Sequence, residues 1–234
     1  MNIFDRSIIY TLHEVSKNSE KLTTFLIFIA SNDFLKGGIV VSIFWYFWFQ
    51  NDTKLNEKRE RIIMSMVSCF LAIFVGRILA RLLPFRSRPV LNPNFSMFFP
   101  SKSVVHGLEL ESSLPSDHAV MFFALATGIF FISRRTGIFT YFYISIFVCF
   151  PRIYLGLHYP SDIVLGAIIG IVVTLVYFHL KFGRILAQKA LVFYGNFPGI
   201  FFLLFFWMCF QIGTMFDSVR EIEHFIFSSL LHFY

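Results

Sequence analysis

Long apolar stretches separated by short polar segments dominate this chain. About 20 predominantly apolar residues are needed to cross the hydrocarbon core of a bilayer, and six stretches approach that length. Their pattern predicts an all-α, polytopic membrane helix bundle with about six transmembrane helices, forming a single domain over residues 1–234 with a transmembrane core at 34–215. The expected spans are residues 34–50, 62–84, 116–133, 137–155, 161–180 and 197–215.

The two ends of the chain are more mixed in character. Between Ile3 and Glu14, apolar residues recur at roughly helical spacing among charged ones, which predicts an amphipathic helix lying in the membrane interface. The apolar piece 22–30 is too short to cross about 30 Å of hydrocarbon, so within 1–33 we expect interfacial or re-entrant helices. If 22–30 does span, the N-terminus changes side and the active face does not. The tail 216–234 is expected to be amphipathic.

Composition supports a membrane protein. Of the 234 residues, 56% are hydrophobic and only 15% are charged, whereas charged residues make up about a quarter of an ordinary soluble domain. The three cysteines each fall inside an apolar run, which favours buried small side chains over a disulfide or zinc set. The formal net charge of +6 would suit a nucleic-acid binder, but in a membrane protein excess Lys and Arg normally mark cytoplasmic loops, so no nucleic-acid partner is expected.

Basic residues cluster on alternate loops. The clusters are at 54–61, at Arg134 and Arg135, and at 181–189, so one topology places all three on the same side of the membrane. The positive-inside rule makes that side cytoplasmic. We therefore expect a multi-pass protein of the cell (inner) membrane with both termini, the connection 85–115 and the polar segment 151–162 at the outer (periplasmic or exterior) face.

Three polar motifs fall at this predicted outer face. Each has an ordinary explanation when taken alone: arginines at a helix end snorkel to the headgroups, a serine caps a helix, and a His–Asp pair opens a helix. Charged groups at membrane depth nevertheless usually have a partner or a task. The motifs are Arg81-x6-Arg88-Pro89, Pro115-Ser116-Asp117-His118 and Arg152-x5-His158-x3-Asp162.

The residue types in these motifs suit phosphate chemistry. Asp162, expected in the first turn of a helix, can reach one ring nitrogen of His158 and leave the other free to attack or to carry a proton. The planar fork of Arg152 suits phosphate oxygens. Ser116 is a good N-cap, and the free N–H groups of the turn that follows can hold an anion.

Taken together, the three motifs resemble the signature of the type-2 phosphatidate phosphatase family, whose superfamily includes bacterial acid phosphatases and vanadium haloperoxidases. That signature reads Lys-x6-Arg-Pro, Pro-Ser-Gly-His and Ser-Arg-x5-His-x3-Asp, and its order and internal spacing are matched over residues 81–162. Three positions depart from it: Arg81 replaces Lys, Asp117 replaces Gly and Pro151 replaces Ser. The Asp variant of the second motif resembles bacterial undecaprenyl-diphosphate phosphatases.

The resemblance implies a membrane lipid phosphatase. The sequence has no carboxylate cluster and no Cys/His set with metal-ligand spacing, so we expect catalysis without a metal or cofactor. The resemblance makes His158 the nucleophile of a phosphohistidine intermediate, with Asp162 holding its ring and His118 protonating the leaving oxygen. The substrate would be a lipid phosphate or diphosphate, with undecaprenyl diphosphate as the first choice, handled at the outer face. The implied phosphate-binding residues are Arg81, Arg88, Ser116, Asp117 and Arg152.

Alternatives remain open from the sequence. The same site could act on a phospholipid or lipid A phosphate, transfer phosphate to another acceptor, or belong to a non-catalytic lipid-phosphate carrier. Arg77 is expected to be a structural partner for Asp117 or Asp162, and Gly166 and Gly170 are expected to allow close helix packing. The oligomeric state is not predicted.

Overall fold

A computed structural model of the chain describes residues 2–17, 19–93, 99 and 112–217. Every regular element in these residues is a helix, which confirms the all-α prediction. The elements are α1 (Ile3–Lys17), α2 (Glu20–Ser31), η1 (Phe34–Gly38), α3 (Ile39–Phe49), α4 (Leu55–Leu82), η2 (Pro89–Leu91), α5 (Asp117–Ile132), α6 (Arg134–Tyr143), η5 (Ile144–Cys149), α7 (Phe150–Tyr154), α8 (Pro160–His179), α9 (Lys181–Asn196) and α10 (Pro198–Gly213).

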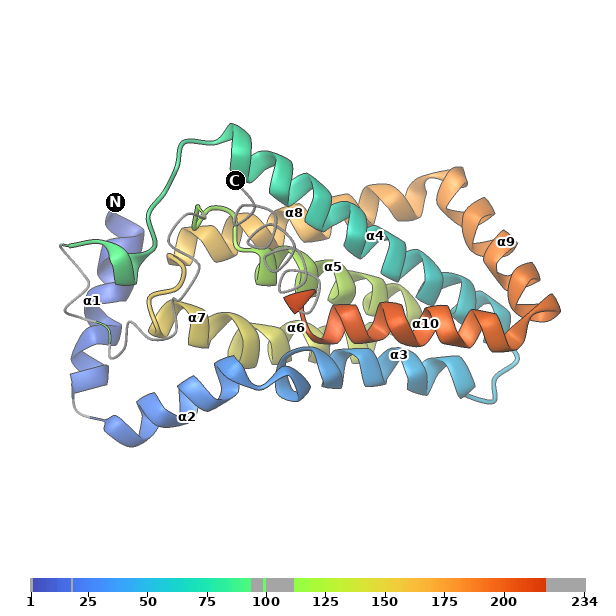
Figure 1. Ribbon diagram of the computed structural model, residues 1–234, viewed down its shortest axis with the longest axis horizontal. Helices are drawn as coiled ribbons and strands as arrows, with labels where there is room; N and C mark the ends of the chain where they lie inside the picture. The colour runs from blue at the N-terminus through green and yellow to red at the C-terminus, as the bar shows by residue number, and fades with distance from the viewer. Residues whose placement is uncertain (1, 18, 94–98, 100–111, 218–234) are drawn as a thin grey trace, which may run out of the picture.

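The helices form an elongated bundle with α5 at its centre (Figure 1). Helices α3, α4, α5, α8 and α10 run along the long axis, whereas α1 lies across one end and α9 lies at the other. Eleven of the 16 residues of α5 are buried, because its sequence is apolar on all sides and such a helix is stable only when neighbours surround it. This central helix begins with the Asp117-His118 pair, so the fold fixes the second motif firmly in place.

Glycines bring α5 and α8 into backbone contact. A Cβ atom added at Gly170 would lie 2.3 Å from the carbonyl oxygen of Val120, and one added at Gly166 would lie 2.7 Å from that of Ser116. Only a residue without a side chain allows this approach. The expected close packing at the two glycines is therefore confirmed, and it holds the first turns of α5 and α8 side by side.

Fewer of the described helices are long enough to span a membrane than the six spans expected from the sequence. Within the part of the chain that the structure describes, three helical stretches are long and apolar enough to cross a membrane: α4, residues 134–154 (α6 through α7) and α8. Helix α2 and the segment Phe34–Phe49 together qualify as a fourth but meet at 67°, as in a broken span or a re-entrant loop. The apolar helices α5 and α10 have 16 residues each. At the bend between α2 and α3, the buried Lys36 pairs with Asp33 at 2.8 Å.

The basic clusters gather at one end of the bundle. Arg61, in the first turns of α4, donates to the carbonyl oxygen of Phe131 near the end of α5 (2.6 Å), and Glu60 pairs with Arg184 of α9 at 3.3 Å. Helix α6, with Arg134 and Arg135, starts beside this end. The expectations for the tail 218–234 and for the loop residues 94–98 and 100–111 fall outside the described residues.

Candidate active site

The three polar motifs converge at the end of the bundle opposite the basic clusters. The chain turns sharply between α7 and α8 at Gly156, whose φ of +70° lies in the left-handed region that glycine adopts without strain. Three backbone hydrogen bonds then connect the motifs to one another and to the residues between them. They are Val90 N–H to the Gly156 carbonyl (3.0 Å), Ser113 N–H to the Arg86 carbonyl (2.8 Å) and Ser116 N–H to the Asp162 carbonyl (3.3 Å).

A small polar cavity of about 50 Å³ lies where the motifs meet. Pockets that enclose whole small molecules measure roughly 300–1,000 Å³, so this one has room for a phosphoryl group but not for the rest of a lipid. Five of the eight predicted site residues line it. The lining consists of Arg77, Ala80, Arg88, Ser112, Pro115, Asp117, His118, Arg152, Leu157 and His158.

His158 is held in one tautomer with its second nitrogen toward the cavity. Its Nδ1 lies 2.8 Å from the carbonyl oxygen of Ser113, which can only accept, so Nδ1 carries the hydrogen. Nε2 accepts from Arg88 Nη1 at 3.3 Å. Burial of the ring, together with the nearby charges of Arg88 and Arg152, lowers the pKa of His158 well below its ordinary value. The imidazole is therefore neutral and keeps a lone pair for attack on phosphorus.

Asp162 does not hold the imidazole in the expected way. Its Oδ2 lies 3.9 Å from His158 Nδ1, too far for a hydrogen bond. The carboxylate instead accepts from the N–H of Tyr159 (2.8 Å) and from Arg86 Nη1 (2.5 Å). Asp162 thus stabilises the turn that carries His158, while the carbonyl oxygen of Ser113 orients the ring.

His118 and Arg152 form the second imidazole–arginine pair of the cavity. Arg152 Nη2 lies 2.6 Å from His118 Nε2 and also donates to the carbonyl oxygen of Ala30 at 3.2 Å. Because a guanidinium can only donate, His118 Nε2 is an acceptor and the ring is neutral in this state. Arg88 and Arg152 therefore each donate to the Nε2 atom of one histidine.

Asp117 is neutralised within the cavity. Arg77 Nη2 lies 2.8 Å from its Oδ2, so the expectation of Arg77 as a partner for Asp117 is confirmed. Arg81, a predicted phosphate-binding residue, is exposed and is not among the residues that line the cavity. Arg77 lies four residues before Arg81, about one turn further into α4, and it is Arg77 that lines the cavity.

Ser116 precedes α5 at the N-cap position, as expected. Its side chain is completely buried and makes no cap hydrogen bond. Within the described part of the chain its hydroxyl has no hydrogen-bond partner, and Ser116 does not line the cavity. The position of Ser116 therefore fits a residue at the start of α5 better than it fits a phosphate ligand.

Two charged residues of the site were not found from the sequence. Arg86 donates through Nη1 to Asp162 and through Nη2 to Asp5 of α1, the latter at 2.6 Å. Arg86 lies inside the first motif at a position that the motif leaves undefined. Asp5 lies 81 residues away in an amphipathic helix, where a lone carboxylate carries no recognisable signal.

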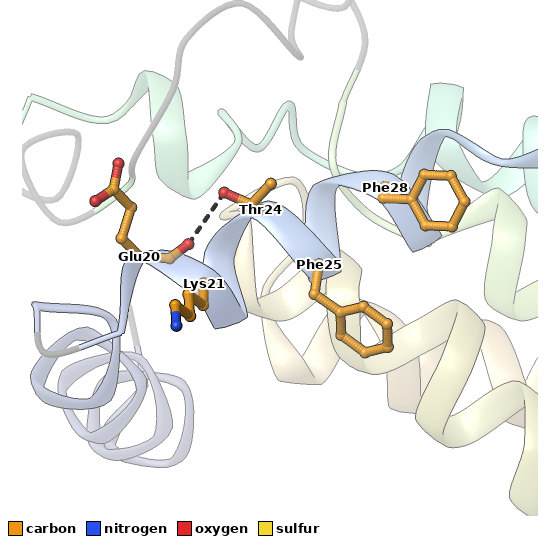
Figure 2. Close-up of a pocket in the computed structure, with 5 residues that line it drawn as sticks. All are labelled: Glu20, Lys21, Thr24, Phe25 and Phe28. Carbon is orange, nitrogen blue, oxygen red and sulfur yellow. Dashed lines mark hydrogen bonds between the residues drawn. The ribbon is translucent and has the colours of Figure 1, made fainter.

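A second hollow on α2 is of a different kind. It is lined by Glu20, Lys21, Thr24, Phe25 and Phe28, all from this one helix (Figure 2). Phe25 and Phe28 are each 54% exposed, and Figure 2 shows both rings pointing away from the helix. None of these residues belongs to the three motifs, so this surface suits contact with lipid rather than chemistry.

Comparison with known proteins agrees with the geometry. Residues 78–186 match the family model described as the PAP2 superfamily. This segment belongs to the PAP2 superfamily. The PAP2 segment contains all three motifs, so the predicted family is confirmed, and with it the assignment of the protein as a membrane-embedded phosphoric ester hydrolase. No solved structure matches the chain significantly.

Two curated relatives match a larger share of the chain than the PAP2 segment covers. The bacitracin transport permease protein BcrC of Bacillus licheniformis is 28% identical over 173 residues, which cover 71% of this chain and 75% of the relative. The undecaprenyl-diphosphatase BcrC of Bacillus subtilis (strain 168) is 20% identical over 174 residues, which cover 74% of this chain and 82% of the relative.

Proposed function

We propose that this PAP2 protein hydrolyses a lipid diphosphate, with undecaprenyl diphosphate as the first candidate, through a phosphohistidine on His158. One observation carries the proposal: two neutral imidazoles and two buried arginines line a single cavity with room for a phosphoryl group. The Nε–H of Arg152 is also buried and makes no hydrogen bond to the described residues. Buried donors of this kind normally have a partner, and a phosphate oxygen would supply one.

The first half-reaction follows from the position of the two histidines. A bound phosphoryl group accepts the hydrogen bonds that Arg88 and Arg152 donate to the imidazoles, which frees both Nε2 atoms. His158 Nε2 attacks phosphorus in line, and the bond to the bridging oxygen breaks. His118, protonated beside the substrate's negative charge, gives its proton to that oxygen, so a lipid monophosphate leaves.

The second half-reaction reverses the role of His118. The neutral ring takes a proton from water, the resulting hydroxide attacks the phosphohistidine, and the N–P bond breaks to release inorganic phosphate and regenerate His158. Arg88 and Arg152 stabilise the oxygens during both steps, because phosphoryl transfer depends mostly on positioning and on charge, while Arg77 neutralises the nearby Asp117 carboxylate. Among the described residues no group of three or more His, Cys, Asp or Glu could hold a metal ion; catalysis without metal stays a prediction.

The charge distribution supports an outward-facing site. The basic clusters lie at the far end of the bundle from the cavity, and the positive-inside rule places that end in the cytoplasm. The phosphate of the substrate would then lie at the outer headgroup level with its tail in the bilayer. Helix α2 fits such an arrangement, since it presents Phe25 and Phe28 outward while its Ala30 carbonyl contacts Arg152.

A panel of substrates tests the proposal. Phosphate release from undecaprenyl diphosphate, phosphatidylglycerol phosphate, phosphatidate and a lipid A analogue is measured in detergent with a chelator present. We expect the wild-type protein to turn over, with undecaprenyl diphosphate the fastest, and His158→Ala to be inactive. A His158→Ala protein that releases phosphate at the wild-type rate contradicts the mechanism.

A non-catalytic lipid-phosphate carrier is the second candidate; the name of the B. licheniformis relative, a bacitracin transport permease protein, also refers to transport, although of another molecule. A carrier would bind lipid phosphate without releasing phosphate, so the same panel separates the two functions. The cavity favours the enzyme, because about 50 Å³ encloses the reacting group alone.

Adding hydroxylated headgroups and searching for a phosphorylated product tests transfer to an acceptor other than water.

A further inference from the structure

The carboxylate of Asp5 is buried at the catalytic end of the bundle, although most of α1 is exposed. Asp5 has no solvent exposure. Its Oδ1 accepts from the N–H of Ser161 (2.8 Å), and its Oδ2 accepts from the Ser161 hydroxyl (2.7 Å) and from Arg86 Nη2 (2.6 Å). The Asp5 carboxylate is thus fully buried and accepts three hydrogen bonds. An amphipathic helix does not need a buried carboxylate in order to lie in the membrane interface.

Arg86 connects this carboxylate to Asp162. Its two terminal nitrogens divide between the carboxylates, Nη2 on Asp5 and Nη1 on Asp162. The guanidinium also lies 3.8 Å from the ring centroid of Tyr159, and Nη1 donates to the Ser161 hydroxyl at 2.8 Å. The guanidinium of Arg86 is therefore held in place by the two carboxylates, the Ser161 hydroxyl and the ring of Tyr159.

Two routes lead from Arg86 to the nucleophile. The Arg86 side chain donates to the Asp162 carboxylate, which also accepts from the N–H of Tyr159, the residue after His158. The backbone carbonyl of Arg86 accepts from Ser113 N–H, and the Ser113 carbonyl accepts from His158 Nδ1. Both the turn that carries His158 and the acceptor that orients its ring depend on where Arg86 lies.

We propose that Asp5 is a positioning residue for the phosphatase reaction, acting through Arg86 and Ser161 on His158. The inference rests on the proposed function and adds to it a residue outside the PAP2 segment. Without the Asp5 charge, the Arg86 fork loses one of its two anchors. An asparagine in its place keeps one oxygen and gains an NH2 group, so in either orientation its NH2 group faces a donor, either the N–H of Ser161 or Arg86 Nη2. A small displacement of a reacting group far from the mutation can slow a reaction about a hundredfold.

The test compares Asp5→Asn, Arg86→Gln and the double variant with the wild-type protein. Glu14→Gln is the matched control, because it makes the same chemical change at an exposed position of the same helix. For each purified, folded protein we measure kcat and KM with the best substrate of the panel. We expect Asp5→Asn to lower kcat about 10- to 100-fold with KM within about twofold, since Asp5 does not line the cavity. The double variant should be no slower than the slower single variant, because both changes break one chain of contacts.

Several results would overturn the inference. These are a wild-type kcat in folded Asp5→Asn protein, a change in KM alone, or a double variant whose loss equals the product of the two single losses. If Asp5→Asn does not fold, Ser161→Ala removes the bridging hydroxyl and leaves the charges paired; we then expect a smaller drop in kcat, and an unchanged kcat refutes the role.

One readout does not need turnover, so failure of the inference can be told apart from failure of the proposed function. The ring nitrogen signals of His158 in NMR spectra of ¹⁵N-histidine-labelled protein report its tautomer and its Ser113 hydrogen bond. Asp5→Asn should shift these signals and Glu14→Gln should not. A wild-type protein inactive on the whole panel would contradict the proposed function, whereas unshifted His158 signals in Asp5→Asn would contradict the role of Asp5.

Discussion

Removal of the Arg77 charge tests the electrostatics of the cavity. Arg77, Arg88 and Arg152 bring three positive charges to its lining, and Asp117 brings one negative charge. Arg77→Gln leaves the Asp117 carboxylate facing the phosphate without its ion-pair partner. We expect weaker binding of the transition state, because a like charge then lies beside a phosphoryl group that carries its own negative charge.

The size of this effect follows from the geometry of the pair. Two unit charges about 4 Å apart interact by roughly 4 kcal/mol near a protein surface and by about 1 kcal/mol in bulk water. The Arg77 side chain is 38% exposed and the Asp117 side chain 20%, so solvent screens part of the interaction and we take about 1–2 kcal/mol. This corresponds to a loss of about 5- to 30-fold in kcat/KM.

The double variant Arg77→Gln/Asp117→Asn supplies the decisive comparison. It restores the net charge of the lining, so most of the loss in kcat/KM should be recovered. The assay is phosphate release under subsaturating substrate at low and at high salt, where the difference between Arg77→Gln and wild type should shrink as salt rises. A double variant as slow as Arg77→Gln would refute the reasoning and would make Arg77 itself a phosphate ligand.

Three further predictions follow from the site and from the packing around it. His118→Ala should slow turnover by about 10²–10⁴-fold and His158→Ala by at least about a thousandfold, with an acid-labile phosphoenzyme in wild type that is missing from His158→Ala; a phosphoenzyme in the latter would exclude His158 as the nucleophile. Because the pKa of folded His158 lies below its ordinary 6.5, the unfolded chain binds a proton there that the folded chain does not; its contribution should make stability fall as pH drops below about 6.5, a trend that thermal unfolding should show to be weaker in His158→Gln, and equal slopes in both proteins would contradict it. Gly170→Ala should destabilise the bundle by about 1–3 kcal/mol, since its Cβ would lie 2.3 Å from a backbone oxygen, whereas Gly199→Ala in α10, where a Cβ meets nothing within 4 Å, should leave the unfolding temperature unchanged.

The sequence predicts the helices and the core of the site well. Apolar runs place α5, α8 and α10 close to their observed bounds, because long apolar segments carry a strong signal. Helix α4 instead begins at Leu55, well before the expected start at residue 62, because charged residues continue a helix beyond the apolar part that marks the span. Motif spacing brings together Arg88, Asp117, His118, Arg152 and His158, which all line the cavity. These residues lie at helix ends or in short turns, where local sequence determines direction.

Contacts between distant segments could not be predicted in the same way. Whether Arg77 or Arg81 reaches the cavity depends on the rotation of α4 against α5, which neither residue specifies. The Ser113 carbonyl is a backbone group, and no side-chain pattern marks it as the acceptor for His158. The pairing of Asp5 with Arg86 depends on how α1 folds back across the bundle, and a single carboxylate in an amphipathic helix does not reveal that.

The bond between Arg152 and the carbonyl oxygen of Ala30 joins two environments at one side chain. Helix α2 carries bulky aromatic rings on its outward surface, while its last turn is attached to the arginine that also contacts His118. Any tilt of α2 caused by a long hydrocarbon chain lying against it would therefore be transmitted to the guanidinium. A short, water-soluble phosphate ester would leave α2 where it is. The protein would then discriminate between long-chain lipid phosphates and short phosphate esters by turnover rate as well as by affinity.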